Sequence, residues 1–193
     1  TDYVFDGSSK VPYREDDQTS PQGVYGKTKL KGELAIQSSG CRYLIFRTAW
    51  VFSEYGSNFL KTMLHLGNKR DEVSVVSDQI GCPTYAQDIA KTITSAVYSL
   101  ETSELTSGLY HYCGDQPCSW YGFANAIFKE AELLRINTPI VVHAIKTLAY
   151  PTPASRPAFS VLDCSRIKNE FGVIPSDWRE GIREVLKVLN KEN

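Results

Sequence analysis

A tyrosine and a lysine four positions apart are the residues of this chain whose types and spacing first suggest chemistry. Tyr25 and Lys29 occur in the run Tyr-Gly-Lys-Thr-Lys, and side chains four positions apart on a helix share one face. A free tyrosine has a pKa of about 10, and an adjacent ammonium group stabilises the phenolate and lowers that pKa. Such a phenol can donate a proton to a carbonyl oxygen during reduction of the carbonyl.

The pair alone is weak evidence, because a chain with 11 tyrosines and 21 lysines and arginines contains about one such pair by chance. Thr1 adds a hydroxyl group. It opens a run of β-forming residues that meets the turn signal Asp6-Gly7, which predicts the end of a strand. Ligands of open α/β sheets bind beyond the carboxyl ends of strands. A hydroxyl, a phenol and an ammonium can therefore converge on one carbonyl oxygen.

Alternating helix and strand signals predict the α/β fold that would position these residues. Helices are expected over residues 21–38, 56–69, 86–100, 119–131 and 176–190, and a short one is expected after Asp163. Strands are expected over 41–47, 73–76 and 108–112. The proline-rich residues 138–160 are expected to be irregular.

Composition excludes several classes of protein. The 193 residues carry a formal charge of -1, which gives no support for a nucleic-acid or membrane-surface partner. Five cysteines at irregular spacing argue against a disulfide framework. No signal peptide or membrane-spanning run is present, so a cytoplasmic location is expected. Cys113, Cys118 and His111 lack a second ligand pair, and no metal site is expected.

Several motifs together resemble one enzyme family. They are Thr1-Asp-Tyr-Val-Phe-Asp-Gly7, Tyr25-Gly-Lys-Thr-Lys29, Arg47-Thr-Ala-Trp-Val-Phe52, Gly56-Ser-Asn-Phe59, Asp78-Gln-Ile-Gly-Cys-Pro-Thr84 and Arg156-Pro-Ala-Phe-Ser160 with Leu162-Asp163. In combination they resemble the extended short-chain dehydrogenase/reductase family, and within it the reductases of dTDP-linked 4-keto-6-deoxysugars. The similarity runs from Thr1 to about Trp178.

The resemblance implies the C-terminal part of a Rossmann-like doubly wound parallel sheet together with a smaller substrate-binding α/β region. Residues 1–52 and 87–113 would be what remains of the dinucleotide-binding domain. Residues 53–86 and 114–193 would bind the nucleotide-sugar.

The resemblance also implies a reaction: NAD(P)H-dependent reduction of the 4-keto group of a dTDP-linked sugar to give dTDP-rhamnose. Thr1 would hydrogen-bond the carbonyl, Tyr25 would donate the proton, and Lys29 would lower the pKa of Tyr25 and hold the nicotinamide ribose. Further residues would contact the ligands. Trp50 and Val51 would lie near the nicotinamide and the sugar, and the nucleotide-sugar would meet Asn58, Gln79, Thr84, Tyr85 and Arg156, whose planar guanidinium suits a diphosphate.

Two departures from the family pattern carry information. The dehydratases of the family have Thr-Asp-Glu where this chain has Thr1-Asp2-Tyr3, which favours simple carbonyl reduction over elimination. The Gly-rich phosphate loop of the family does not occur in residues 1–193. The resemblance therefore implies that about a hundred residues of the doubly wound sheet are missing, and that this piece alone is inactive.

Two other functions remain open at this point. The regulatory subunit of methionine adenosyltransferase resembles these reductases and acts as a binding partner; the intact Tyr25 and Lys29 argue against that role. A nucleotide-sugar epimerase would run without net consumption of NADPH or NADH. An uncovered sheet edge also invites self-association, so a homodimer is one expectation.

Overall fold

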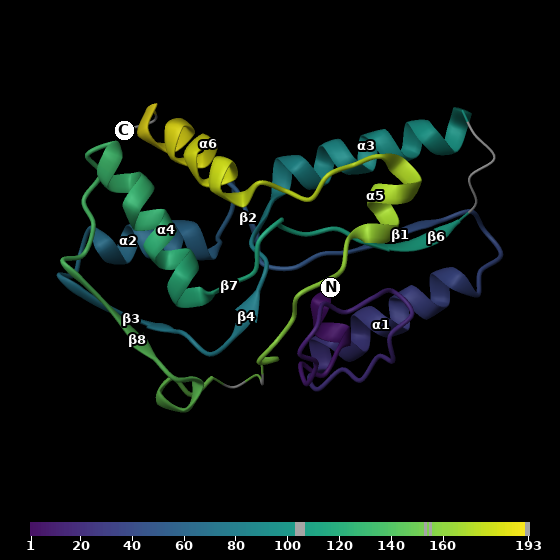
Figure 1. Cartoon of the computed structure of the whole chain (residues 1–193), viewed down its shortest axis with the longest axis horizontal. Coiled ribbons are helices and arrows are strands. Elements are labelled where there is room, and N and C mark those ends of the chain that lie inside the picture. Colours follow the sequence, from purple (N-terminus) through teal and green to yellow (C-terminus); the bar gives the residue numbers. More distant parts are fainter. Residues whose placement is uncertain (103–106, 153, 155, 192–193) are drawn as a thin grey trace.

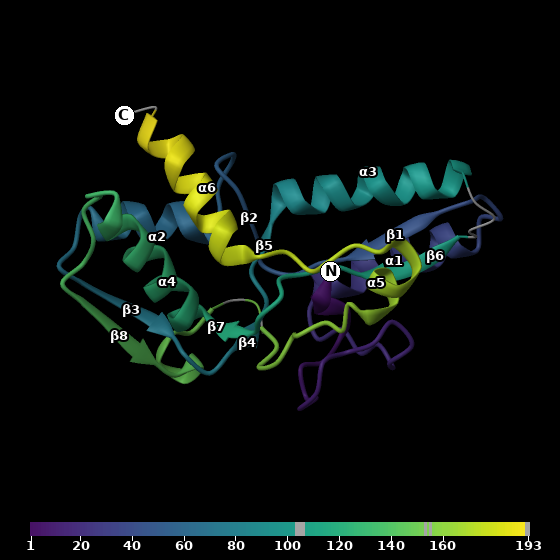
Figure 2. The same ribbon diagram turned by 45° about the horizontal axis from the view of Figure 1, so that its top comes forward.

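The computed structural model describes residues 1–102, 107–152, 154 and 156–191, and it has an α/β fold with two lobes (Figure 1). One lobe contains α1 (Val24–Gln37), β1 (Leu44–Arg47), α3 (Ala86–Thr102), β6 (Gly108–His111) and α5 (Ser165–Phe171). The other contains α2 (Phe59–Gly67), β3 (Glu72–Val76), α4 (Trp120–Leu133), β8 (Val141–Ile145) and α6 (Trp178–Lys191). The same division is visible after rotation (Figure 2).

Short elements join the lobes or flank them. They are η1 (Asp2–Val4), β2 (Val51–Phe52), β4 (Ile80–Gly81), β5 (Thr84–Tyr85), β7 (Cys118–Ser119) and η2 (Thr147–Ala149). The strands form pairs: β1 with β6, β2 with β5 and β3 with β8 are parallel, and β4 with β7 is antiparallel. The pairs β2–β5 and β4–β7 lie where the chain passes between the lobes (Figure 2).

Each lobe has its own hydrophobic core. In the lobe of α1, residues such as Phe5, Tyr110 and Ile167 are almost fully buried, and in the other lobe residues such as Phe123 and Leu186 are. The predicted boundary assigned all of 114–193 to the substrate region, whereas α5 packs in the core of the α1 lobe. The division into a dinucleotide region and a substrate region stays a prediction.

Helix ends follow local chemistry. The Ser119 hydroxyl caps α4 by accepting from the Gly122 amide at 3.0 Å, which fits the predicted N-cap. Helix α1 starts at Val24, later than the predicted start at residue 21, and its N-cap is Gly23. The other expected helices are present within a few residues of their predicted ends.

Two sequence predictions of secondary structure were wrong. Residues 2–4 form a turn of 3-10 helix instead of a strand end, because the Asp2 carbonyl accepts from the Phe5 amide at 3.1 Å and the Thr1 hydroxyl caps the turn. The segment 138–160 contains strand β8, whose backbone hydrogen-bonding groups pair with those of β3. Its prolines flank the strand instead of interrupting it, and residues 153 and 155 lie outside the described part.

Within the described residues, no helix is both long enough and apolar enough to cross a membrane.

Candidate functional site

The predicted catalytic residues line one groove between η1, α1 and the end of β1. We call it the α1 groove; its volume is about 690 Å³. It is lined by residues that include Thr1, Tyr3, Tyr25, Lys29, Trp50 and Val51. The structure therefore brings together the hydroxyl, the phenol, the ammonium, and Trp50 and Val51 at the start of β2.

Helix α1 presents Tyr25 and Lys29 to this groove. The Lys29 Nζ lies 5.7 Å from the centre of the Tyr25 ring, and 54% of Tyr25 is exposed. The ring of Tyr3 meets that of Tyr25 edge to face, with 5.8 Å between ring centres and 85° between planes. Gly26 permits this approach, because a Cβ there would overlap the Tyr3 carbonyl.

The η1 turn holds Thr1 against a buried carboxyl group. The Thr1 hydroxyl donates to Asp2 Oδ1 at 3.1 Å and accepts from the Tyr3 amide at 3.3 Å. Asp2 is 2% exposed, and burial raises its pKa, although hydrogen bonds from Ser160 and Thr1 oppose the rise. Among the described residues, Asp2 Oδ2 and Thr48 Oγ1 are buried without a hydrogen-bond partner.

A buried ion pair fixes α1 to β1. Glu33, two turns after Tyr25, accepts from Arg47 Nη2 at 2.7 Å and from its Nε at 3.1 Å and 3.2 Å, and both residues are buried. Arg47 Nη1 also lies 3.4 Å from Nε2 of His111 on β6. Burial, together with the charge of Arg47, lowers the pKa of His111 to about 3. The three residues connect α1 to both strands beneath it.

Trp50 forms the end wall of the groove. Its backbone is left-handed, with φ of 46°, which is rare for a bulky residue. Its ring stacks on that of Trp120, with 3.5 Å between ring centres and 7° between planes. Val51, next in the chain, is 45% exposed and lines the groove.

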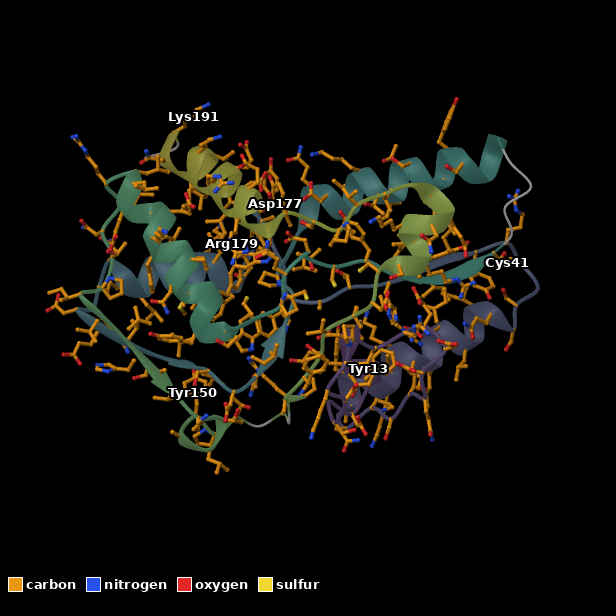
Figure 3. The ribbon with its side chains drawn as sticks, viewed as in Figure 1. Tyr13, Cys41, Tyr150, Asp177, Arg179 and Lys191 are labelled. Atoms are coloured by element: carbon orange, nitrogen blue, oxygen red, sulfur yellow. The ribbon has the colours of Figure 1, made fainter. Side chains whose placement is uncertain are left out.

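A second cavity lies beside the stacked tryptophans. We call it the β3 pocket; its volume is about 260 Å³. Its lining includes Phe59, Met63, Gln79, Trp120, Tyr150 and Arg156. Gln79 is 5% exposed, and its Nε2 donates to Thr147 Oγ1 at 3.1 Å. Tyr150 lies next to η2 at the edge of the lobe (Figure 3).

Arg156 lines one cavity, and its positive charge affects a residue of the other. Burial raises the pKa of Tyr3, the negative charge of Asp2 adds to the rise, and the positive charge of Arg156 opposes it. Arg156 lines the β3 pocket, and its positive charge acts on Tyr3, which lines the α1 groove. A guanidinium in the β3 pocket suits an anionic group of a ligand there.

Three residues predicted to contact the nucleotide-sugar make defined contacts within the chain, and their contact with a ligand stays a prediction. Asn58 caps α2 by accepting from the Lys61 amide at 3.2 Å, and its amide donates to Ser53 O at 2.7 Å. Thr84 is fully buried, and its hydroxyl bonds backbone oxygens. Tyr85 lines a third cavity, between α3 and α6. Burial and the nearby Glu54 carboxylate raise the pKa of Tyr85 to about 12.

Sequence reasoning missed Tyr3 and Trp120 as site residues. Tyr3 lies two positions after Thr1, so the signal was present in the same motif. Trp120 follows the predicted N-cap Ser119, but nothing in the sequence connects it with Trp50. In the described part of the chain, no group of three or more histidine, cysteine, aspartate or glutamate residues could hold a metal ion.

Comparison with known proteins yields one consistent group of relatives. The family model described as RmlD substrate binding domain matches residues 1–191. A dTDP-4-dehydrorhamnose reductase of Aggregatibacter actinomycetemcomitans is 45% identical over 96% of this chain, and one of Sinorhizobium fredii is 43% identical over 98%. The chain spans 64% of the length of each of these relatives.

Solved structures give the same group. A dTDP-4-dehydrorhamnose reductase of Clostridium acetobutylicum superposes with a TM-score of 0.88 at 38% identity, over 97% of this chain and 63% of that one. A dTDP-4-dehydrorhamnose reductase of Bacillus anthracis in complex with NADP superposes with a TM-score of 0.86 at 34% identity, over 97% and 63%. A dTDP-glucose 4,6-dehydratase of Bacillus anthracis, at 13% identity and a TM-score of 0.78, shares the fold.

Proposed function

Because the chain belongs to the RmlD substrate binding domain family, we propose that its protein is a dTDP-4-dehydrorhamnose reductase. The reaction would use NADPH or NADH to reduce the 4-keto group of dTDP-4-dehydrorhamnose and give dTDP-rhamnose. The observation that carries the proposal is the meeting of Thr1, Tyr25 and Lys29 in the α1 groove beside Trp50. The relatives from Aggregatibacter actinomycetemcomitans and Sinorhizobium fredii carry this name, and a protein of the same name from Bacillus anthracis was solved with NADP.

The α1 groove fits the nicotinamide end of a dinucleotide. Its volume is about 690 Å³, and the exposed side chains of Tyr25 and Lys29 lie along one side of it. The ammonium of Lys29 would hold the ribose hydroxyls, and Trp50 and Val51 would border the nicotinamide and the sugar. When bound, the dinucleotide supplies the hydride that the chain's own residues cannot supply.

Tyr25 is the proposed proton donor. Its hydroxyl would give a proton to the carbonyl oxygen while the carbon is reduced, and Lys29 would place a positive charge near the phenolate that remains. Thr1 would hold the same carbonyl oxygen. Its hydroxyl proton now points to Asp2, so rotation about one bond redirects it to the substrate. Tyr3 supplies no carboxylate for elimination, which favours reduction.

The β3 pocket is the proposed place of the nucleotide. Aromatic and apolar side chains of Phe59, Met63 and Tyr150 suit a base, and Gln79 offers an amide. Arg156, which lines this pocket, would pair with the diphosphate. The site would then depend indirectly on Asn58, Thr84 and Tyr85, because these residues hold the backbone and the helices that border it.

Replacement of one oxygen atom tests the proposal. Tyr25→Phe in the complete protein should lower the rate of NADPH oxidation with dTDP-4-dehydrorhamnose by a factor of about 100 or more, while binding of the nucleotide-sugar remains. Tyr55→Phe is the matched control, because Tyr55 is 76% exposed and lines neither cavity. Unchanged turnover in Tyr25→Phe would remove Tyr25 from the mechanism.

The same assay separates the alternatives. An epimerase would convert the sugar without net oxidation of NADPH, and a regulatory subunit would bind a synthetase without any turnover. A cytoplasmic location and a homodimer belong to the proposal as well. All five cysteines are free thiols, as expected in a reducing compartment, and light scattering of the complete protein tests the dimer.

A further inference from the structure

The conformation of Trp50 is strained and is held from several sides. A bulky residue with a positive φ persists only where its surroundings fix it, and such residues cluster at functional sites. The Thr84 amide donates to the Trp50 carbonyl at 3.2 Å, and the Thr84 hydroxyl donates to Ala49 O at 2.7 Å. At Gly81, a Cβ would lie only 2.5–2.8 Å from three atoms of the indole. These contacts fix the backbone of Trp50 and one side of its ring.

Trp120 contacts another part of the Trp50 ring. The two indoles are 3.5 Å apart between centres and nearly parallel, at 7°. Trp120 is the first residue of α4, which Ser119 caps, and its ring also packs 4.6 Å from that of Phe59. Helix α4 and Phe59 therefore hold the Trp120 indole in place against the Trp50 indole.

The stacked pair also separates the two cavities. Trp50 lines the α1 groove and Trp120 lines the β3 pocket. Trp50 packs against the cores of both lobes, whereas Trp120 packs against one. A ligand in the β3 pocket would touch one indole, and a sugar in the α1 groove would touch the other.

We propose that Trp120 is a positioning residue, which orients the Trp50 indole toward the sugar and makes that orientation depend on the occupant of the β3 pocket. The proposal rests on the proposed function, in which the nucleotide lies in the β3 pocket and the reacting sugar lies in the α1 groove. The nucleotide half of the substrate then helps to align the sugar half, although the two do not share a cavity.

Circular dichroism of the ligand-free protein tests the stack itself. Two stacked indoles in contact couple their strong far-ultraviolet transitions, so the complete wild-type protein should give a paired signal that Trp120→Leu and Trp120→Phe both lose. Tyr121→Phe is the matched control, because it changes the next residue of α4 and leaves both indoles in place. A paired signal that persists in Trp120→Leu would overturn the proposal. This measurement needs no substrate and is independent of the proposed reaction.

Steady-state kinetics test the positioning role. Misplacement of a reacting group by about 1 Å can cost about 100-fold in rate, so Trp120→Leu should lower kcat/KM for dTDP-4-dehydrorhamnose by about 10- to 100-fold. Trp120→Phe, which keeps an aromatic ring against Trp50, should recover most of the loss. The proposal would be overturned if Trp120→Leu turned over as fast as the wild type. It would also be overturned if Trp120→Phe turned over no faster than Trp120→Leu.

Thymidine diphosphate is the probe for the dependence on the β3 pocket. In the wild-type protein it should change the paired signal without any sugar present, and in Trp120→Leu the signal of the remaining indoles should stay constant at saturation. A wild-type signal that thymidine diphosphate leaves unchanged, or a change in Trp120→Leu, would overturn the dependence. Where urea unfolding shows that Trp120→Leu does not fold, the wild-type measurement still tests the dependence. Failure of the proposed function is distinguishable, because the wild type would then show no turnover.

Discussion

Acid should destabilise this protein through one buried histidine. His111 is fully buried on β6. Its Nδ1 lies 3.0 Å from Tyr13 O, and its Nε2 lies 3.4 Å from Arg47 Nη1. This arrangement fits a neutral ring that donates from Nδ1 and accepts at Nε2. A proton added to Nε2 would place a second positive charge beside the Arg47 cation inside the core.

The size of the effect follows from the two pKa values. Burial and Arg47 lower the pKa of His111 from 6.5 to about 3 in the folded protein. Between these values the unfolded chain binds one more proton at this residue, so stability falls as pH falls, by about 1.4 kcal/mol per pH unit. From pH 7 to pH 5 the loss amounts to about 2 kcal/mol. Below pH 3 both states are protonated and the contribution levels off.

Urea unfolding at pH 7, 6 and 5 measures this loss against His111→Gln. Asp2 and Glu15 have raised pKa values because of burial, and they oppose the trend on acidification. The negative charge of Asp163 also raises the pKa of His111. These carboxyl groups remain in the variant, so the difference between the two slopes isolates His111. Parallel slopes in the two proteins would refute the reasoning, whatever their absolute stabilities.

Three further changes test other parts of the structure. Arg47→Met should cost about 3–5 kcal/mol in urea unfolding because it leaves Glu33 buried and unpaired, and Arg47→Met with Glu33→Leu should recover most of that loss; no recovery would count against the pair. Gly26→Ala should cost about 1–3 kcal/mol and lower turnover, whereas Gly32→Ala, which has open space around its Cβ, should not destabilise. Ser119→Ala should lower stability by about 1 kcal/mol in thermal unfolding, and an unchanged midpoint would contradict the cap.

The α/β fold and the family resemblance were predictable from the sequence, and both are confirmed. Helix periodicity and cap residues such as Ser119 are local signals, so most helices were found near their true positions. Strand β8 was missed because its pairing with β3 is a long-range contact that no local pattern encodes. Proline at the ends of a segment does not distinguish an irregular region from a strand with flanking turns.

The candidate site was predictable to the extent that its residues share motifs. Tyr25 and Lys29 follow from helical spacing, and the structure places both in the groove with Thr1. The contact of Thr84 with a ligand stays a prediction from its motif. In the structure Thr84 is fully buried, and its hydroxyl donates to the Ala49 carbonyl beside Trp50. Trp120 was not predictable, since only the folded chain brings it against Trp50. The assignment of these residues to the reaction stays a prediction.

The parallel pairing of distant strands has a consequence for the speed of folding. Arg47 on β1 faces His111 on β6, 64 positions later, and Ser77 after β3 bonds Ile145 on β8, 68 positions later. Such contacts close long loops before they gain any compensating interaction, which slows folding. We expect refolding to take milliseconds or longer, with exposed strand edges during that time that favour aggregation at high concentration.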